Sequence, residues 1–190
     1  MRRFMTCALA MILLLSGCSS GNAAYAVFTQ FRETLNGMES LSITAGVNTD
    51  YGSYVFDCTL ALKWNSESNS AEITVIEPES VAGIRAVLTE GKWKLGADTV
   101  LLGAGDIENR TLAPLTALYK MLCAWQSAPV TSSCLDEVYG KSAVRITLGG
   151  EQGEDTVQDV WIEQGTLLPL RAEIAEGGKT IHSARFIYDT

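Results

Sequence analysis

Hydrophobic residues recur along this chain with two spacings, and each spacing predicts one kind of element. At residues 25–38 apolar side chains fall three or four positions apart, which predicts an amphipathic helix. At residues 54–64 apolar and polar side chains alternate, which predicts a strand with one apolar and one mostly polar face. A second helical stripe covers residues 115–125, and Ala128-Pro129 ends it. The segment after Pro129, which carries Cys134, is predicted to be a loop.

Short strands separated by turns account for most of the remaining pattern. The apolar runs predict strands at 72–77, 84–88, 92–95 and 99–102, then at 143–148, 156–163, 167–175 and 179–188. Glycine-rich turns separate the last four, and such spacing predicts an antiparallel meander. The order is helix, strands, helix, strands. We therefore expect an α+β fold in which one strongly curved antiparallel sheet holds two main helices against its concave side.

The first residues of the chain have the three zones of an export signal. Arg2 and Arg3 form a short positive region, residues 8–15 are apolar, and Leu15-Ser16-Gly17-Cys18 resembles the lipobox of bacterial lipoproteins. We expect a signal peptide at 1–17, a diacylglycerol thioether on Cys18, a lipidated tether at 18–24 and a single domain at 25–190. This predicts an extracytoplasmic protein that is lipid-anchored to the cell membrane. An ordinary signal peptide or a short uncleaved anchor is the alternative.

The net charge of the chain limits the kinds of molecule that it can bind. The chain has 22 acidic and 14 basic residues and a formal charge of −8, and losing the two positive charges of Arg2 and Arg3 takes it to −10. An acidic surface repels nucleic acids and anionic lipid headgroups, so we exclude nucleic-acid binding.

Three cysteines remain when Cys7 is removed with the signal peptide and Cys18 carries lipid. Cys123 and Cys134 are the nearest pair in sequence and are the candidate disulfide. Three free thiols, with Cys58 on the apolar face of its strand, are the alternative.

Residues that could carry catalysis or hold a metal ion are sparse. The single histidine, His182, lies in a predicted strand, where a lone histidine is more often structural than catalytic. A zinc site needs several histidine or cysteine ligands at suitable spacing, and the common nucleophile, phosphate-loop and metalloprotease motifs are absent from the sequence. We therefore expect no cofactor, no metal and no enzymatic activity. A hydrolase with two dispersed carboxylates is the remaining enzymatic alternative.

Two segments resemble LolA-like proteins. Ile76-Glu77-Pro78-Glu79-Ser80-Val81-Ala82-Gly83-Ile84, followed by Gly91-Lys92-Trp93-Lys94-Leu95, is similar to the middle of that superfamily. Gly165-Thr166-Leu167-Leu168-Pro169-Leu170-Arg171-Ala172-Glu173-Ile174, with Gly177-Gly178-Lys179 and Ala184-Arg185-Phe186, is similar to its last hairpin. The resemblance implies an incomplete β-barrel, a half-barrel whose open side is closed by helices.

The resemblance also implies a binding role. LolA and LolB carry lipoproteins by sheltering their acyl chains, and RseB-like relatives bind lipoprotein-derived or polypeptide signals. GerS-like germination lipoproteins of spore-forming bacteria act through partners that process the cell wall. We expect a membrane-anchored, non-enzymatic module that binds an envelope protein or an apolar ligand, in a GerS-like role in sporulation, germination or wall processing. The alternative is a lipid or lipoprotein carrier, whose apolar concave face would include Leu60, Leu88, Trp93, Leu95 and Ile174.

Overall fold

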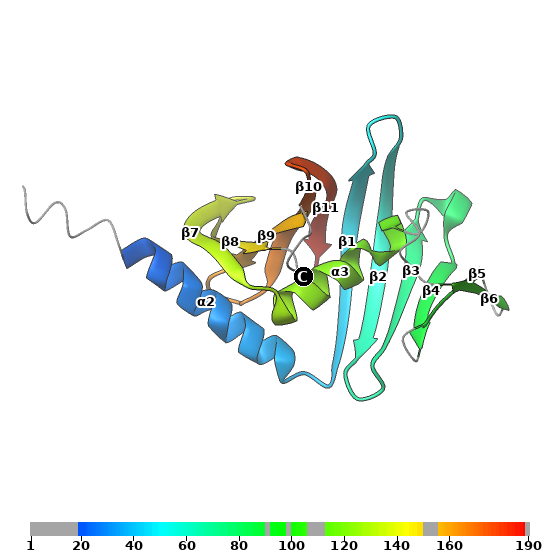
Figure 1. Cartoon of the computed structure of the whole chain (residues 1–190), viewed down its shortest axis with the longest axis horizontal. Coiled ribbons are helices and arrows are strands. Elements are labelled where there is room, and N and C mark those ends of the chain that lie inside the picture. The colour runs from blue at the N-terminus through cyan, green and yellow to red at the C-terminus, as the bar shows by residue number, and fades with distance from the viewer. Residues whose placement is uncertain (1–18, 90–91, 98–99, 106–112, 150–155, 189–190) are drawn as a thin grey trace, which may run out of the picture.

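The computed structural model describes residues 19–89, 92–97, 100–105, 113–149 and 156–188. They form two main helices, one short 3₁₀ helix and eleven strands. The elements are α2 (Ser19–Asn36), β1 (Ser40–Asp50), β2 (Val55–Asn65), β3 (Ser70–Glu77), η1 (Glu79–Val81), β4 (Ile84–Thr89), β5 (Lys92–Ala97), β6 (Val100–Gly105), α3 (Ala113–Ser127), β7 (Val130–Val138), β8 (Lys141–Gly149), β9 (Thr156–Glu163), β10 (Pro169–Glu176) and β11 (Lys179–Ile187). Figure 1 shows their arrangement.

All eleven strands belong to one antiparallel sheet in the order β6-β5-β4-β3-β2-β1-β11-β10-β9-β8-β7. The sheet is therefore two meanders, β1 to β6 and β7 to β11, joined only where the first strand pairs with the last. In that pairing Val47 lies opposite Ala184 and Thr44 opposite Ile187. The two ends of the sheet, β6 and β7, are not paired with each other, so the barrel stays open. The predicted α+β fold with an unclosed antiparallel sheet and two helices is confirmed.

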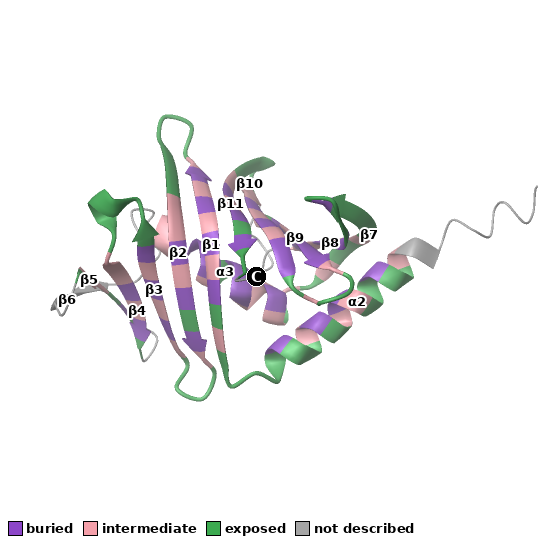
Figure 2. Cartoon of the chain, turned by 180° about the vertical axis from the view of Figure 1, so that it is seen from behind, coloured by how far each residue is buried: buried purple, intermediate pink, exposed green. Residues whose placement is uncertain are grey.

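The sheet buries one face under the two helices, as alternation along its strands requires. In β1 the residues Ile43, Ala45, Val47 and Thr49 are buried, while the residues between them are partly exposed. In Figure 1 α3 crosses in front of the sheet and α2 begins beside β7, and in Figure 2, seen from behind, α3 lies behind the sheet. The helices contribute Phe28, Phe31 and Leu35 from α2 and Ala117, Leu118, Met121, Leu122 and Trp125 from α3 to the same core.

Two local predictions differ from the structure. The first helix begins at Ser19 and not at Tyr25, so residues 19–24 are helical and not an extended tether. Burial of Ala24 and a hydrogen bond from the Ser133 hydroxyl to the Gly21 carbonyl oxygen (2.9 Å) hold these residues on β7. The segment that carries Cys134 is the edge strand β7 and not a loop, because pairing with β8 orders a stretch whose own side chains are mostly exposed.

Candidate functional site

The concave-face residues that the sequence singled out do come together, but as core. Leu60, Leu88, Trp93 and Ile174 are buried in the main core, and Leu95 is half-buried against it. The ring of Trp93 meets the ring of Tyr119 from α3 edge-on at a centroid distance of 5.4 Å. Helix α3 therefore covers the surface that a carrier would need to expose.

The predicted Cys123–Cys134 disulfide is absent, because Cys58, Cys123 and Cys134 are all free thiols. Cys123 is half-buried in α3, whereas Cys134 is exposed on β7 opposite Arg145 of β8. Burial raises the pKa of the Cys58 and Cys123 thiols.

The predicted lipid-anchor residue Cys18 and the predicted signal peptide at 1–17 lie outside the described residues. Within the part of the chain that the structure describes, no helix combines the length and apolar character that crossing a membrane requires. Any attachment through Cys18 would therefore be made directly ahead of Ser19, where α2 begins.

A groove with a volume of ≈ 990 Å³ lies on the face of the sheet that faces away from the helices. Its floor crosses the central strands β1, β2 and β11, where the outward residues include the small Gly46, Thr59 and Ser183. One wall comes from β2, β3 and η1, and the other from β10, β11 and the β7–β8 turn. None of the five predicted concave-face residues lines it.

The first wall is acidic. Asp57, Glu77 and Glu79 line it beside Ile76, Pro78 and Ala82. The Asn48 side chain donates a hydrogen bond to Asp57 (2.6 Å), and the Thr59 hydroxyl donates one to Glu77 (2.9 Å). These bonds fix two of the carboxylates without neutralising their charge.

The second wall is basic and aromatic. Tyr139 and Gly140 both have positive φ (54° and 72°), the conformation of a tight two-residue hairpin turn, and this turn brings the Tyr139 ring to the groove. The Arg185 guanidinium carbon lies 4.6 Å from the centroid of that ring. Arg171 forms an ion pair with Glu173 and lies 5.1 Å from the centroid of Trp161. The groove thus separates acidic from basic groups across an uncharged floor.

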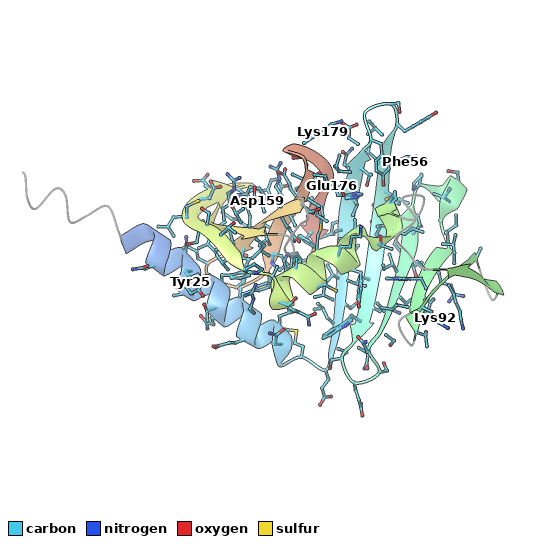
Figure 3. All side chains as sticks on the ribbon, in the orientation of Figure 1. Tyr25, Phe56, Lys92, Asp159, Glu176 and Lys179 are labelled. Atoms are coloured by element: carbon cyan, nitrogen blue, oxygen red, sulfur yellow. The ribbon has the colours of Figure 1, made fainter. Side chains whose placement is uncertain are left out.

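Exposed apolar side chains lie at the β1–β2 hairpin, and none of them lines the groove. The β1–β2 hairpin projects beyond the neighbouring strands in Figure 1, and Asn48 and Asp57 pair at its base. Tyr54 is 68% exposed, Val55 59% and Phe56 49%. Figure 3 labels Phe56 at this end of the sheet. Alternation along β2 puts Phe56 on the opposite face from Asp57 and Thr59, and its ring meets that of Tyr51 at a centroid distance of 6.4 Å.

The titratable groups offer little for catalysis. His182 lies on the opposite face of β11 from the groove, where Thr49 bonds its Nδ1 (2.9 Å). Burial, reinforced by the charge of Lys120, lowers the pKa of His182 to about 4. Among the described residues, no three His, Cys, Asp or Glu side chains are placed to share a metal ion.

The charged residues of the groove were not predicted as site residues. Their only signal in the sequence is that Asp57 and Thr59 occupy the polar positions of the alternating strand at 54–64. Arg171 and Arg185 lie more than a hundred residues further along the chain, and only the β1–β11 pairing brings them to the same groove.

Comparison with known proteins identifies a fold. No family model matches the chain, and no curated protein matches it. Among solved structures, LprF from Mycobacterium bovis is similar at 13% identity with a TM-score of 0.51, over 89% of this chain and 93% of that one. An uncharacterized conserved protein from Thermus thermophilus is similar at 12% identity with a TM-score of 0.50, over 86% of each chain. A LolA superfamily protein from Nitrosomonas europaea also matches, at 10% identity with a TM-score of 0.41, over 88% and 91%. The first two likenesses show a shared fold and, at these identities, nothing about ligands.

Proposed function

We propose that this protein is a lipid-anchored, non-enzymatic binding module outside the cytoplasmic membrane, and that it binds an envelope protein through the groove on its helix-free face. The observation that carries the proposal is the contrast between the two faces of the sheet. The concave face is filled by α2, α3 and the core, whereas the face away from these two helices has an open groove with opposed charges and the exposed ring of Tyr139.

The anchor supports this role because it limits where the partner can be. The lipobox ends at Cys18, and α2 begins at the next residue. Since α2 packs on β7, a lipid on Cys18 would connect to the folded domain without a flexible linker between them. The domain would then meet partners that are themselves in or near the membrane.

The finer form of the proposal is a GerS-like role, in which the partner processes cell wall during sporulation or germination. Its support is the sequence resemblance at residues 76–84 and 165–174, together with the lipobox. The structure adds that η1 and part of the first segment form the acidic wall of the groove. A GerS-like module would therefore present this segment to its partner.

Site-specific photocrosslinking in the producing cell tests the proposal. A photoreactive residue replaces Thr59 on the groove floor or Ser183 beside it, and the matched control replaces Thr89, which is exposed on β4 and does not line the groove. We expect both groove positions to crosslink to the same membrane-associated protein and the control not to. A crosslink of equal yield from Thr89, or none from the groove, would contradict the proposal.

The alternative function is a carrier of lipids or lipoproteins. The observation in its favour is the continuous apolar surface under α3, which includes Leu60, Leu88 and Ile174 and would open if α3 moved away. This alternative expects lipid to co-purify with the protein. Organic extraction followed by mass spectrometry measures that lipid, and protein free of lipid apart from its own anchor would count against the carrier.

A further inference from the structure

The charges of the groove are largely unpaired within the protein. Among the described residues, no ion pair involves Asp57, Glu77, Glu79 or Arg185, whereas Arg171 already pairs with Glu173. Three carboxylates therefore face the groove from one side and one free guanidinium from the other. A ligand that fits both walls must carry positive charge on one side and negative charge on the other.

Several of these groups are held in place before any ligand arrives. Stacking on Tyr139 orients the Arg185 guanidinium while leaving its N–H edges free, and such stacking suits arginine better than lysine. Asn48 and Thr59 fix the carboxylates of Asp57 and Glu77. Because the side chains are already ordered, a ligand loses less free energy in ordering them on binding.

The floor favours a thin, extended ligand. Gly46 has no side chain, and a Cβ built there would meet nothing within 4 Å, so the floor is open above the backbone of β1. Ser183 adds only a short side chain beside it, and the side chain of Ala184 points to the core on the other face. An extended polypeptide can lie on such a floor, and its successive side chains then point to opposite sides.

We propose that the groove binds an extended polypeptide segment in which basic and acidic side chains alternate, the basic ones facing Asp57, Glu77 and Glu79 and the acidic ones facing Arg185. This deepens the proposed function, on which it rests, by naming the chemistry of the partner segment. Polyanions fit poorly because three carboxylates would repel them, and polycations meet the guanidiniums of Arg171 and Arg185. A peptide with alternating charges places opposite charges against both walls at once.

A pair of synthetic peptides of equal composition tests the pattern directly. One peptide alternates lysine and glutamate, and the other places all its lysines before all its glutamates, so both have the same length and net charge. Fluorescence anisotropy of each labelled peptide is measured against the full-length protein in mild detergent at low ionic strength. We expect the alternating peptide to bind at least about fivefold more tightly, with the preference shrinking as salt screens the partly exposed walls. Equal affinity for the two peptides would overturn the proposal.

Charge variants locate the binding. Arg185→Gln should weaken the alternating peptide about fivefold, which corresponds to ~1 kcal/mol for a partly exposed ion pair, and Arg185→Glu should weaken it further. Lys92→Glu is the matched control for the reversal, because Lys92, labelled in Figure 3, is exposed on β5 and does not line the groove. Glu79→Lys should weaken binding as well, and Glu33→Lys on the exposed side of α2 is its control. Controls that weaken binding as much as the groove variants would refute the proposal.

The outcome is separable from that of the proposed function. The peptide assay depends on neither the lipid nor the identity of the envelope protein, so failed crosslinking leaves it standing. If crosslinking succeeds but the two peptides bind equally well, the groove is still the binding site, and the proposed alternation of charges in its ligand is wrong. Circular dichroism of every variant checks that the sheet is intact, which we expect because Arg185, Glu79, Lys92 and Glu33 are all exposed.

Discussion

Arg32 of α2 hydrogen-bonds to the C-terminal end of α3, and its replacement should weaken the contact between these two helices and lower the stability of the fold. Its Nε donates to the carbonyl oxygen of Trp125 (2.7 Å), and its Nη2 donates to that of Ala128 (2.6 Å), at the C-terminal end of α3. Carbonyl groups at a helix end have no partner inside the helix and attract positive charge. The guanidinium also lies 4.5 Å from the centroid of the Phe28 ring.

The size of the effect follows from these contacts. Hydrogen bonds from a charged donor contribute roughly 1.5–3 kcal/mol each when buried, and the half-exposed position of Arg32 places them at or below the low end. Arg32→Met keeps the packing of the methylene groups and removes both bonds, so it should lower the free energy of unfolding by about 3 kcal/mol. Arg32→Lys keeps the charge and one bond at most, so its loss should be about half as large.

Urea unfolding followed by tryptophan fluorescence measures these changes, since Trp125 lies at the contact. The control is Glu33→Ala, an exposed neighbour on α2 that should change stability by less than about 0.5 kcal/mol. In a thermal scan the Arg32→Met variant should melt roughly 6–12 °C lower. An Arg32→Met protein as stable as the Glu33→Ala control would refute the structural role of this residue.

Three further predictions concern single ionisable or reactive groups. The pKa of His182 is lowered to about 4 in the folded protein and is about 6.5 in an unfolded chain. The neutral side chain therefore contributes its full stabilisation above about pH 6.5. This contribution is lost as the pH falls toward 4, because the unfolded chain then binds a proton that the folded protein does not. Urea titrations across that range should show a weaker pH dependence for His182→Asn than for the native chain. Replacement of Cys18 by alanine should release the protein from the membrane or leave its signal peptide uncleaved. Membrane fractionation and labelling with radioactive palmitate measure the two outcomes. A correctly cleaved Cys18→Ala protein that stays on the membrane would contradict the lipid anchor. Maleimide labelling under denaturing conditions should count three free thiols in the mature chain, and under native conditions Cys134 should react before Cys58 and Cys123, whose thiol pKa values are raised by burial. A single reactive thiol after denaturation would instead indicate the disulfide.

The local pattern of the sequence was sufficient for most of the elements, apart from β1 and β7, and for the fold class. The strand predicted at 156–163 has the bounds of β9, and the alternation at 54–64 places Leu60, Leu62 and Trp64 on the buried face of β2 as expected. The start of α2 was missed because Ser-Ser-Gly-Asn is a poor helix former by itself, and its helix depends on packing against β7. Strand β7 was missed for a similar reason, since its side chains are mostly exposed and its order comes from β8.

The candidate site was harder to predict because periodicity reports which face of a strand is apolar and not what covers that face. Leu60, Leu88 and Ile174 all lie in the main core, but the stripe of α3 that fills the space over them could equally have faced elsewhere. The outward-facing residues are difficult to predict for a different reason. Asp57 and Arg185 are ordinary solvent-facing residues of two separate hairpins, and no local pattern distinguishes them from charges that only keep a surface hydrated.

What makes these outward residues a site is one pairing between distant parts of the chain. The acidic wall belongs to the meander β1 to β6 and the basic wall belongs to β7 to β11, and among the strands that the structure describes only β1 and β11 pair across the two meanders. Contacts between distant segments incur a loop-closure cost that the sequence pattern does not reveal. The groove therefore exists only when both meanders have formed and joined. A partner that binds across it recognises the completed fold, because neither wall alone offers both charges.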